Sequence, residues 1–210
     1  MTELTIVGVP QSTYVRAIRM ACHEKGVSYQ LDAQVPHSDA ALAVHPMGFI
    51  PGLRHGDVTV AESHAIARYI DQAFDGPALF PSSVKGSARA DYWVSLQNTR
   101  FDEPLIRQYL FGYIRSGTAD GSPDRTRIDD ALPDVENRFD VLEQTLSSSA
   151  YLVGDALSYA DLNLFPMLAY VTRMPEGGQM VAARPALQAY FDGLSSRSSA
   201  VETQPPLPGN

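Results

Sequence analysis

Cysteine is almost absent from this sequence, since Cys22 is the only one among its 210 residues. One thiol excludes an internal disulfide framework, a Cys-x-x-Cys redox pair and a cysteine-based zinc cluster. It also fits a reducing compartment, so we expect a cytoplasmic protein. Cys22 falls on the apolar stripe of an expected helix, and we interpret it as a packing residue rather than as a nucleophile.

Positive charge is also scarce, because 16 Lys and Arg stand against 24 Asp and Glu, for a formal net charge of −8. Nucleic acids and anionic membranes are bound by clustered cations, so we expect neither as a partner. No apolar segment has membrane-spanning length, and we expect no signal peptide at the N-terminus. The five histidines show no metal-ligand spacing, so no metal is expected.

What the first 75 or so residues do contain is an alternation of strand and helix signals. We expect these elements in order: a strand at 4–9, a helix at 12–25 ended by Gly26, a strand at 27–35, a short helix at 38–44, two strands within 51–61 joined at His55-Gly56-Asp57, and a helix at 62–74. The first β-α-β unit should pair its strands in parallel. This order is that of a thioredoxin-like domain.

The composition changes at 75–87, where Gly, Pro and Ser concentrate as they do in a linker. Beyond this linker almost every segment has helical periodicity. The fold class is therefore α/β plus all-α, with a thioredoxin-like domain at 1–78 followed by an all-helical C-terminal domain at 87–203. We expect the last eight residues to be a frayed tail.

The sequence gives signals for the course of two helices in the second half. An apolar stripe runs from Ile128 to Leu146 and contains Pro133, which predicts either a kink or a helix that begins near the proline. Ser158 is predicted to cap another helix in a capping box with Asp161. We interpret this capping motif as structural and expect it to hold a buried helix.

Three segments together carry a resemblance to a known family: "GVPQSTYVRAIRMACHEKGVSYQL", "HPMGFIPGLRHGDVTVAESHAIARYI" and "YLVGDALSYADLNLF". Over nearly its whole length the chain resembles the cytosolic glutathione S-transferases, within the serine-type classes, which include phi-like and related bacterial members. The resemblance implies an enzyme of detoxification that activates the glutathione thiol for attack on small hydrophobic electrophiles. It also implies a homodimer, with glutathione as co-substrate and no metal.

The resemblance assigns the two ends of glutathione to the segment 49–70. Ile50 and Pro51 would form an edge for the glutathione cysteine, because the proline is cis in the family and the backbone of Ile50 would pair with the ligand. Ser63 would donate to the γ-glutamyl carboxylate at a helix N-terminus, while Glu62 would accept from the ammonium group. Taken alone, an edge-strand proline and ordinary first-turn residues would explain the same sequence.

The thiolate should be stabilised at the start of the first helix, and we expect the catalytic hydroxyl to be that of Ser12. A hydroxyl donor and a helix N-terminus lower the pKa of a thiol, and the thiolate is the nucleophile. Ser12 can also be the N-cap of this helix, and Thr13 and Tyr14 remain alternatives for the catalytic role. His37, with Ser38 as a neighbour, is the candidate for the glycine carboxylate. The other four histidines are interpreted as surface or loop residues.

The electrophile pocket should use aromatic residues of the second domain, of which at most two of four are expected to line it: Phe101, Tyr109, Phe111 and Tyr113. A partner chain would contribute Asp102 or Asn98 near the γ-glutamyl amine, with Arg68 at the dimer interface. Two alternatives stay open. One is a glutathione-dependent isomerase, dehalogenase or peroxidase, and the other is a non-catalytic binding protein with the same fold.

Overall fold

The computed structural model describes residues 3–115, 117–118 and 120–206. Their contacts divide the chain into two compact units. The first takes in Met1–Ser87 together with Ser196–Asn210, and the second is Ala88–Ser195.

The first unit is built on a four-stranded sheet with the order β2-β1-β3-β4. The strands are β1 (Leu4–Val7), β2 (Gln30–Asp32), β3 (Gly52–His55) and β4 (Val58–Ala61). β1 and β2 are parallel, whereas β1–β3 and β3–β4 are antiparallel, as predicted. β2 is shorter than expected because the backbone on both sides of it bonds elsewhere. The N–H of Val27 donates to the carbonyl of Cys22 in the preceding helix, and the N–H of Gln34 donates to the carbonyl of Asp32.

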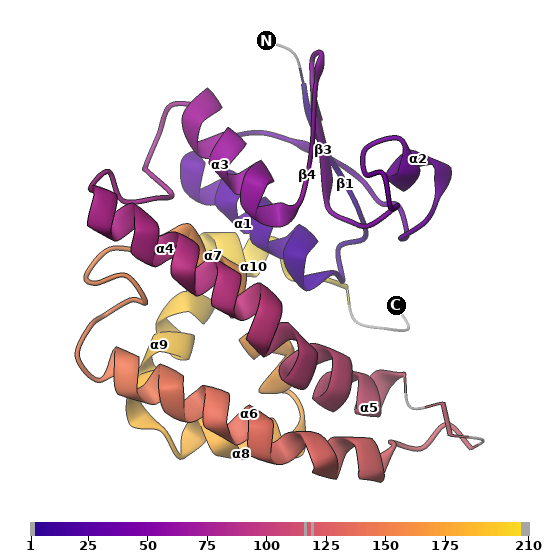
Figure 1. Cartoon of the computed structure of the whole chain (residues 1–210), viewed down its shortest axis with the longest axis vertical. Coiled ribbons are helices and arrows are strands. Elements are labelled where there is room, and N and C mark those ends of the chain that lie inside the picture. The colour runs from indigo at the N-terminus through magenta and orange to yellow at the C-terminus, as the bar shows by residue number, and fades with distance from the viewer. Residues whose placement is uncertain (1–2, 116, 119, 207–210) are drawn as a thin grey trace. The chain divides into compact units, whose positions relative to one another are not determined.

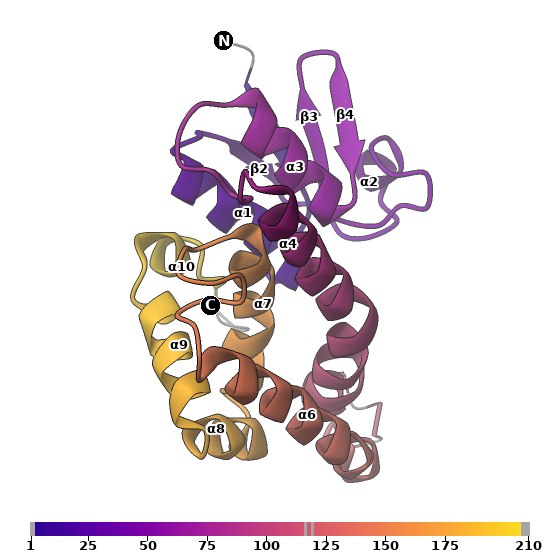
Figure 2. The same cartoon turned by 60° about the vertical axis from the view of Figure 1, so that its left-hand side comes forward.

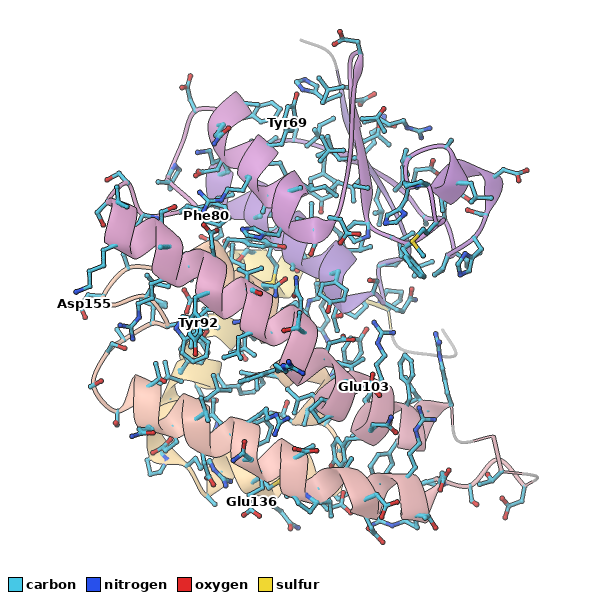
Figure 3. The ribbon with its side chains drawn as sticks, in the orientation of Figure 1. Tyr69, Phe80, Tyr92, Glu103, Glu136 and Asp155 are labelled. Atoms are coloured by element: carbon cyan, nitrogen blue, oxygen red, sulfur yellow. The ribbon has the colours of Figure 1, made fainter. Side chains whose placement is uncertain are left out.

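Three helices flank this sheet: α1 (Thr13–Lys25), α2 (Asp39–Leu42) and α3 (Ser63–Ala73). In Figure 1, α1 and α3 lie on one side of the sheet and α2 lies on the other. α1 ends as predicted at Gly26, whose φ of 73° lies in the left-handed region that favours glycine. The side chain of Tyr69 in α3, labelled in Figure 3, reaches His55 of β3, with 2.8 Å between its hydroxyl and Nδ1.

The segment after Ser195 belongs to the first unit, which corrects two expectations. It contains α10 (Ser198–Glu202), so the second unit ends before residue 203. Thr203 is fully buried instead of frayed, because Arg16 donates to its hydroxyl at 3.5 Å and Arg19 donates to its carbonyl at 3.2 Å. Polar contacts with α1 therefore order a segment that has too few apolar residues to form a core. Residues 207–210 of the expected tail lie outside the described residues.

The second unit is helical. Its elements are α4 (Val84–Leu96, which begins in the last residues of the first unit), the π-helical segments η1 (Gln97–Phe101) and η2 (Glu103–Leu110), α5 (Phe111–Ile114), α6 (Arg125–Leu146), α7 (Tyr159–Val171), α8 (Pro175–Ala182) and α9 (Pro185–Ser195). Figure 2 shows α6 beside α8 and α9, and these helices are in contact. α6 begins at Arg125, where Asp124 caps it, so Pro133 does not start the helix but lies inside it.

The predicted capping box of α7 is confirmed. Asp161 is fully buried, and its Oδ2 accepts from the backbone N–H of Ser158 at 2.8 Å and from the Ser158 hydroxyl at 3.0 Å. Its Oδ1 accepts from the N–H of Leu152 at 2.9 Å and from the Tyr190 hydroxyl at 3.0 Å. Burial raises the pKa of Asp161, and these four donors act against that rise. The motif thus anchors a helix that is buried along nearly all of its length.

Candidate functional site

The loop that follows β1 and the loop that precedes β3 meet at Gly8. A Cβ on Gly8 would lie 2.5 Å from Cγ2 of Val15 and 3.1 Å from Cβ of Ile50, so only glycine fits there. Val15 is in turn bound to Ser12, whose hydroxyl oxygen accepts from the Val15 N–H at 3.4 Å. The predicted N-cap role of Ser12 is confirmed. Gly8 therefore packs against both Ile50 and Val15, the residue that Ser12 caps.

The alternatives to Ser12 differ in their exposure. Thr13 is buried, with 6% of its surface exposed. Ser12 and Tyr14 are half-buried and retain surface that a ligand could touch. Burial therefore speaks against Thr13, while Ser12 is partly exposed and caps the first turn of α1.

The Ile50-Pro51 peptide bond is cis, as the resemblance implied. Pro51 is buried, and Ile50 is half-buried just before the first paired residue of β3, Gly52. Among the described residues, no backbone hydrogen bond of Ile50 is found outside the sheet ladder, which begins at Gly52. Its backbone N–H and C=O therefore have no partner among the described backbone groups.

Glu62 and Ser63 lie at the N-terminus of α3. Glu62 is the N-cap residue with φ 68° and ψ 117°, a positive φ that is uncommon outside glycine. Its side chain makes no capping hydrogen bond and is 77% exposed, while Ser63 is buried. The first amides of a helix have no partner within it, so this end favours an anion.

His45 is the residue of the site that sequence reasoning missed. His45 lies in a loop, as one reading of the sequence allowed, but it is not a surface residue, because only 6% of it is exposed. Its Nε2 lies 3.1 Å from Oε1 of Glu62, and its Nδ1 accepts from the N–H of Met47 at 3.0 Å. The only signal for it in the sequence is its place in the short loop before Ile50.

His37 lies in the turn before α2, beside the residues that precede Ile50. Its backbone N–H donates to the carbonyl of Gly48 at 2.7 Å, and its ring centroid is 5.4 Å from that of Phe49, next to Ile50. Its side chain is exposed. Ser38, the neighbouring alternative, caps α2 by accepting from the N–H of Ala41 at 3.2 Å.

The four aromatic candidates of the second unit separate into two groups. Phe101 and Tyr109 are buried, with 2% and 0% of their surfaces exposed, so neither lines an open pocket. The hydroxyl of Tyr109 donates to Glu176 at 3.0 Å and accepts from the N–H of Gly177 at 2.8 Å, and burial together with the Glu176 carboxylate raises its pKa. Phe111 and Tyr113 are half-buried and remain candidates.

The residues proposed to reach a partner chain are engaged within their own. Asp102 accepts from Nε of Arg107 at 2.7 Å, and Asn98 accepts from Asn163 at 2.9 Å. The guanidinium of Arg68 lies 3.8 Å from the ring centre of Phe80, which Figure 3 labels.

The second unit also has an open groove of about 630 Å³ along η1, η2 and α6. Charged residues line much of it, including Arg100, Glu103, Arg127 and Asp134. A groove of this character does not suit a small hydrophobic electrophile. Within the described residues, no group of three or more His, Cys, Asp or Glu could hold a metal, and no helix has the length and apolarity to cross a membrane.

A thioredoxin-like sheet with a cis-proline edge, joined to an all-helical unit, defines the class of this protein, and comparison with known proteins agrees. Residues 6–78 match the family model "Glutathione S-transferase, N-terminal domain" and residues 103–198 match "Glutathione S-transferase, C-terminal domain". Glutathione S-transferase F9 of Arabidopsis thaliana is 30% identical, over 86% of each chain.

Solved structures extend this likeness to the fold. Glutathione transferase F7 from Populus trichocarpa is 31% identical with a TM-score of 0.83, over 95% of this chain and 97% of that one. The maize glutathione S-transferase I in complex with an atrazine glutathione conjugate is 25% identical with a TM-score of 0.84, over 96% of each chain. The chain belongs to the glutathione S-transferase family.

Proposed function

We propose that this protein is a glutathione transferase that activates the thiol of glutathione for attack on small electrophilic molecules. The observation that carries the proposal is the packing at Gly8, which lies against the side chain of Ile50 and against Val15, the residue whose N–H donates to the Ser12 hydroxyl. A cysteine paired with Ile50 would bring its sulfur toward the Ser12 hydroxyl. Membership of the family and the maize relative bound to a glutathione conjugate support the same reaction.

The proposed chemistry needs little more than position and a lowered thiol pKa. A free thiol has a pKa of about 8.5, and hydroxyl donation at a helix N-terminus stabilises the thiolate. The thiol proton leaves to solvent and the thiolate sulfur bonds to the electrophilic carbon, which either loses a leaving group such as chloride or, in an addition, has its neighbouring atom take a proton from solvent. The enzyme forms no covalent bond. Holding the two reactants together accounts for the remaining rate enhancement. No step of this chemistry calls for a metal.

The γ-glutamyl end of glutathione would bind at the start of α3. The amides of the first turn and the Ser63 hydroxyl would hold its carboxylate, and Glu62 would accept from its ammonium group. His37, exposed beside Phe49, would approach the glycine carboxylate. Phe111 and Tyr113 are the two aromatic residues that we retain for the electrophile.

We further propose that the protein is a cytoplasmic homodimer that takes part in detoxification of hydrophobic electrophiles. The single buried Cys22 suits a reducing compartment. Two copies would provide the partner-chain residue that the resemblance implies near the γ-glutamyl amine. Sedimentation of the purified chain tests the dimer, because a monomer at all concentrations would contradict it.

Retention on immobilised glutathione, followed by a conjugation assay with a chlorodinitroaromatic substrate, tests the main proposal. We expect specific elution by free glutathione and a rate of conjugation above that of the uncatalysed reaction. Retention without conjugation to several electrophiles would favour a glutathione-dependent isomerase, dehalogenase or peroxidase. If the protein is not retained and does not catalyse conjugation, the proposal is overturned and a non-catalytic member of the family remains.

A further inference from the structure

Glu62 is a long, exposed carboxylate that needs help to keep one orientation. Its side chain is 77% exposed and makes no capping hydrogen bond to α3. A glutamate of this kind has much rotamer freedom to lose when it binds a ligand. An acceptor that is already fixed before the ligand arrives binds it more tightly.

His45 provides a rigid donor to this carboxylate. Because the N–H of Met47 donates to Nδ1 at 3.0 Å, Nδ1 carries no proton in the neutral ring, and Nε2 is the N–H that donates to Glu62 at 3.1 Å. The ring is buried and makes a T-shaped contact with the ring of Phe49, with centroids 5.4 Å apart. The backbone of His45 is fixed as well, since its N–H donates to Ala41 at 2.8 Å.

We infer that His45 is a positioning residue for glutathione. Its Nε2–H holds Oε1 of Glu62 and leaves the other carboxylate oxygen to accept from the ammonium of the γ-glutamyl group. The inference rests on the proposed function, in which Glu62 is that acceptor. His45 itself touches no part of the ligand and acts through Glu62 alone, as outer residues orient the ligands of a metal.

Two substitutions at this position separate the two nitrogens of the ring. In His45→Gln, the amide nitrogen occupies roughly the place of Nε2 and can still donate to Glu62, while the acceptor for Met47 is lost. In His45→Asn, the amide oxygen occupies roughly the place of Nδ1 and can still accept from Met47, while the donor to Glu62 is lost. The pair is therefore matched in chemistry and opposite in effect.

The measurement is calorimetric binding of glutathione and of an analogue in which the α-amino group is replaced by hydrogen. We expect the wild-type protein to prefer glutathione about tenfold, as a charge-assisted hydrogen bond provides. His45→Asn should reduce this preference to about twofold, as Glu62→Gln does, while His45→Gln retains most of it. In the Glu62→Gln background, His45→Asn should change the preference no further.

The outcomes distinguish the inference from its premise. A wild-type protein that binds neither compound, or binds both equally, would overturn the proposed role of Glu62 and the inference with it. Wild-type preference that persists in His45→Asn would overturn the inference alone. So would a loss of affinity for both compounds that is larger in His45→Gln than in His45→Asn, because that pattern assigns His45 only to the support of Met47.

Discussion

Glu24 and Arg197 form a two-point ion pair, with Nε of Arg197 2.7 Å from Oε1 of Glu24 and Nη2 2.7 Å from Oε2. Ser199 adds a third donor to the same carboxylate at 2.5 Å. Burial acts to raise the pKa of Glu24, but the hydrogen bonds from Arg197 and Ser199 outweigh it and lower the pKa. This pair attaches the C-terminal segment to α1.

Arg197→Ala should therefore lower the free energy of unfolding by about 2 kcal/mol, because it leaves a mostly buried carboxylate without its charged partner. The stability of Arg197→Lys should fall between those of the wild type and Arg197→Ala, since lysine keeps the charge but not the two-point geometry. Urea unfolding measures the change, and limited proteolysis should cut the C-terminal segment of Arg197→Ala first. A loss below about 0.5 kcal/mol would mean that the pair behaves as an exposed salt bridge.

Ser12→Ala should remove most of the turnover while leaving glutathione affinity within a few fold. The hydroxyl is proposed to stabilise the thiolate, so the apparent pKa of bound glutathione should rise toward the free value of about 8.5. This pKa is read from the pH dependence of kcat/KM for the electrophile at saturating glutathione. Because Ser12 also caps α1, its loss destabilises the helix by about 1 kcal/mol.

Ser12→Gly separates these two roles of Ser12. Glycine at an N-cap costs only a few tenths of a kcal/mol relative to serine, yet it has no hydroxyl. We expect Ser12→Gly to be nearly as stable as the wild type and as slow as Ser12→Ala. If Ser12→Gly keeps the wild-type rate, the catalytic hydroxyl belongs elsewhere, and Tyr14→Phe is the next variant to assay.

The ends of α1 and α7 could be predicted because their signals are local. Ser12, Gly26 and the Ser158–Asp161 box each act on a backbone group within four positions, so the sequence pattern contains the whole interaction. The burial of Thr203 could not be predicted, because its partner Arg16 lies 187 positions away. The tail has the composition of a disordered end, and contacts with α1 give Thr203 its place.

In the candidate site, too, some residues could be predicted from a local motif and others depend on contacts between distant segments. The family resemblance identified Pro51 and its cis bond, which a short motif marks. His45 was missed because its role depends on a hydrogen bond to Glu62, on the far side of the β3–β4 hairpin. Tyr109 was one of four aromatic candidates for the electrophile pocket, and its full burial could not be predicted because the sequence alone does not tell a buried aromatic residue from one that faces a ligand.

Cys22 should be inert to alkylation in the folded protein. Its side chain is fully buried, and burial raises the pKa of its thiol to about 12, so almost no thiolate exists at neutral pH. Mass spectrometry after treatment with iodoacetamide at pH 8 should find the native protein unlabelled and the urea-unfolded protein labelled once. Cys22→Ala should keep full conjugation activity. Rapid labelling of the native protein would show that α1 opens readily.

Glu176 should make the second unit sensitive to acid. Burial acts to raise the pKa of its carboxyl, but the Tyr113 hydroxyl at 2.5 Å, the backbone, the Arg125 guanidinium at 2.8 Å and Tyr109 together lower it to about 2. A carboxyl whose pKa is lower in the folded state stabilises the protein fully above its unfolded pKa of 4.5, and this contribution is lost as pH falls toward 2.

Glu176→Gln should lower the free energy of unfolding by about 1–2 kcal/mol at pH 7, where charge-assisted hydrogen bonds are lost. The difference from the wild type should shrink between pH 5 and about 2, because the wild type loses the same contribution there. The fluorescence of Trp93, the only tryptophan, reports unfolding of this unit. Asp155→Asn, which removes an exposed carboxylate of the same unit (Figure 3), is the matched control and should show no such convergence. A difference that stays constant across this range would contradict the assigned ion pair, because only an ionised Glu176 gains from Arg125 and Tyr113.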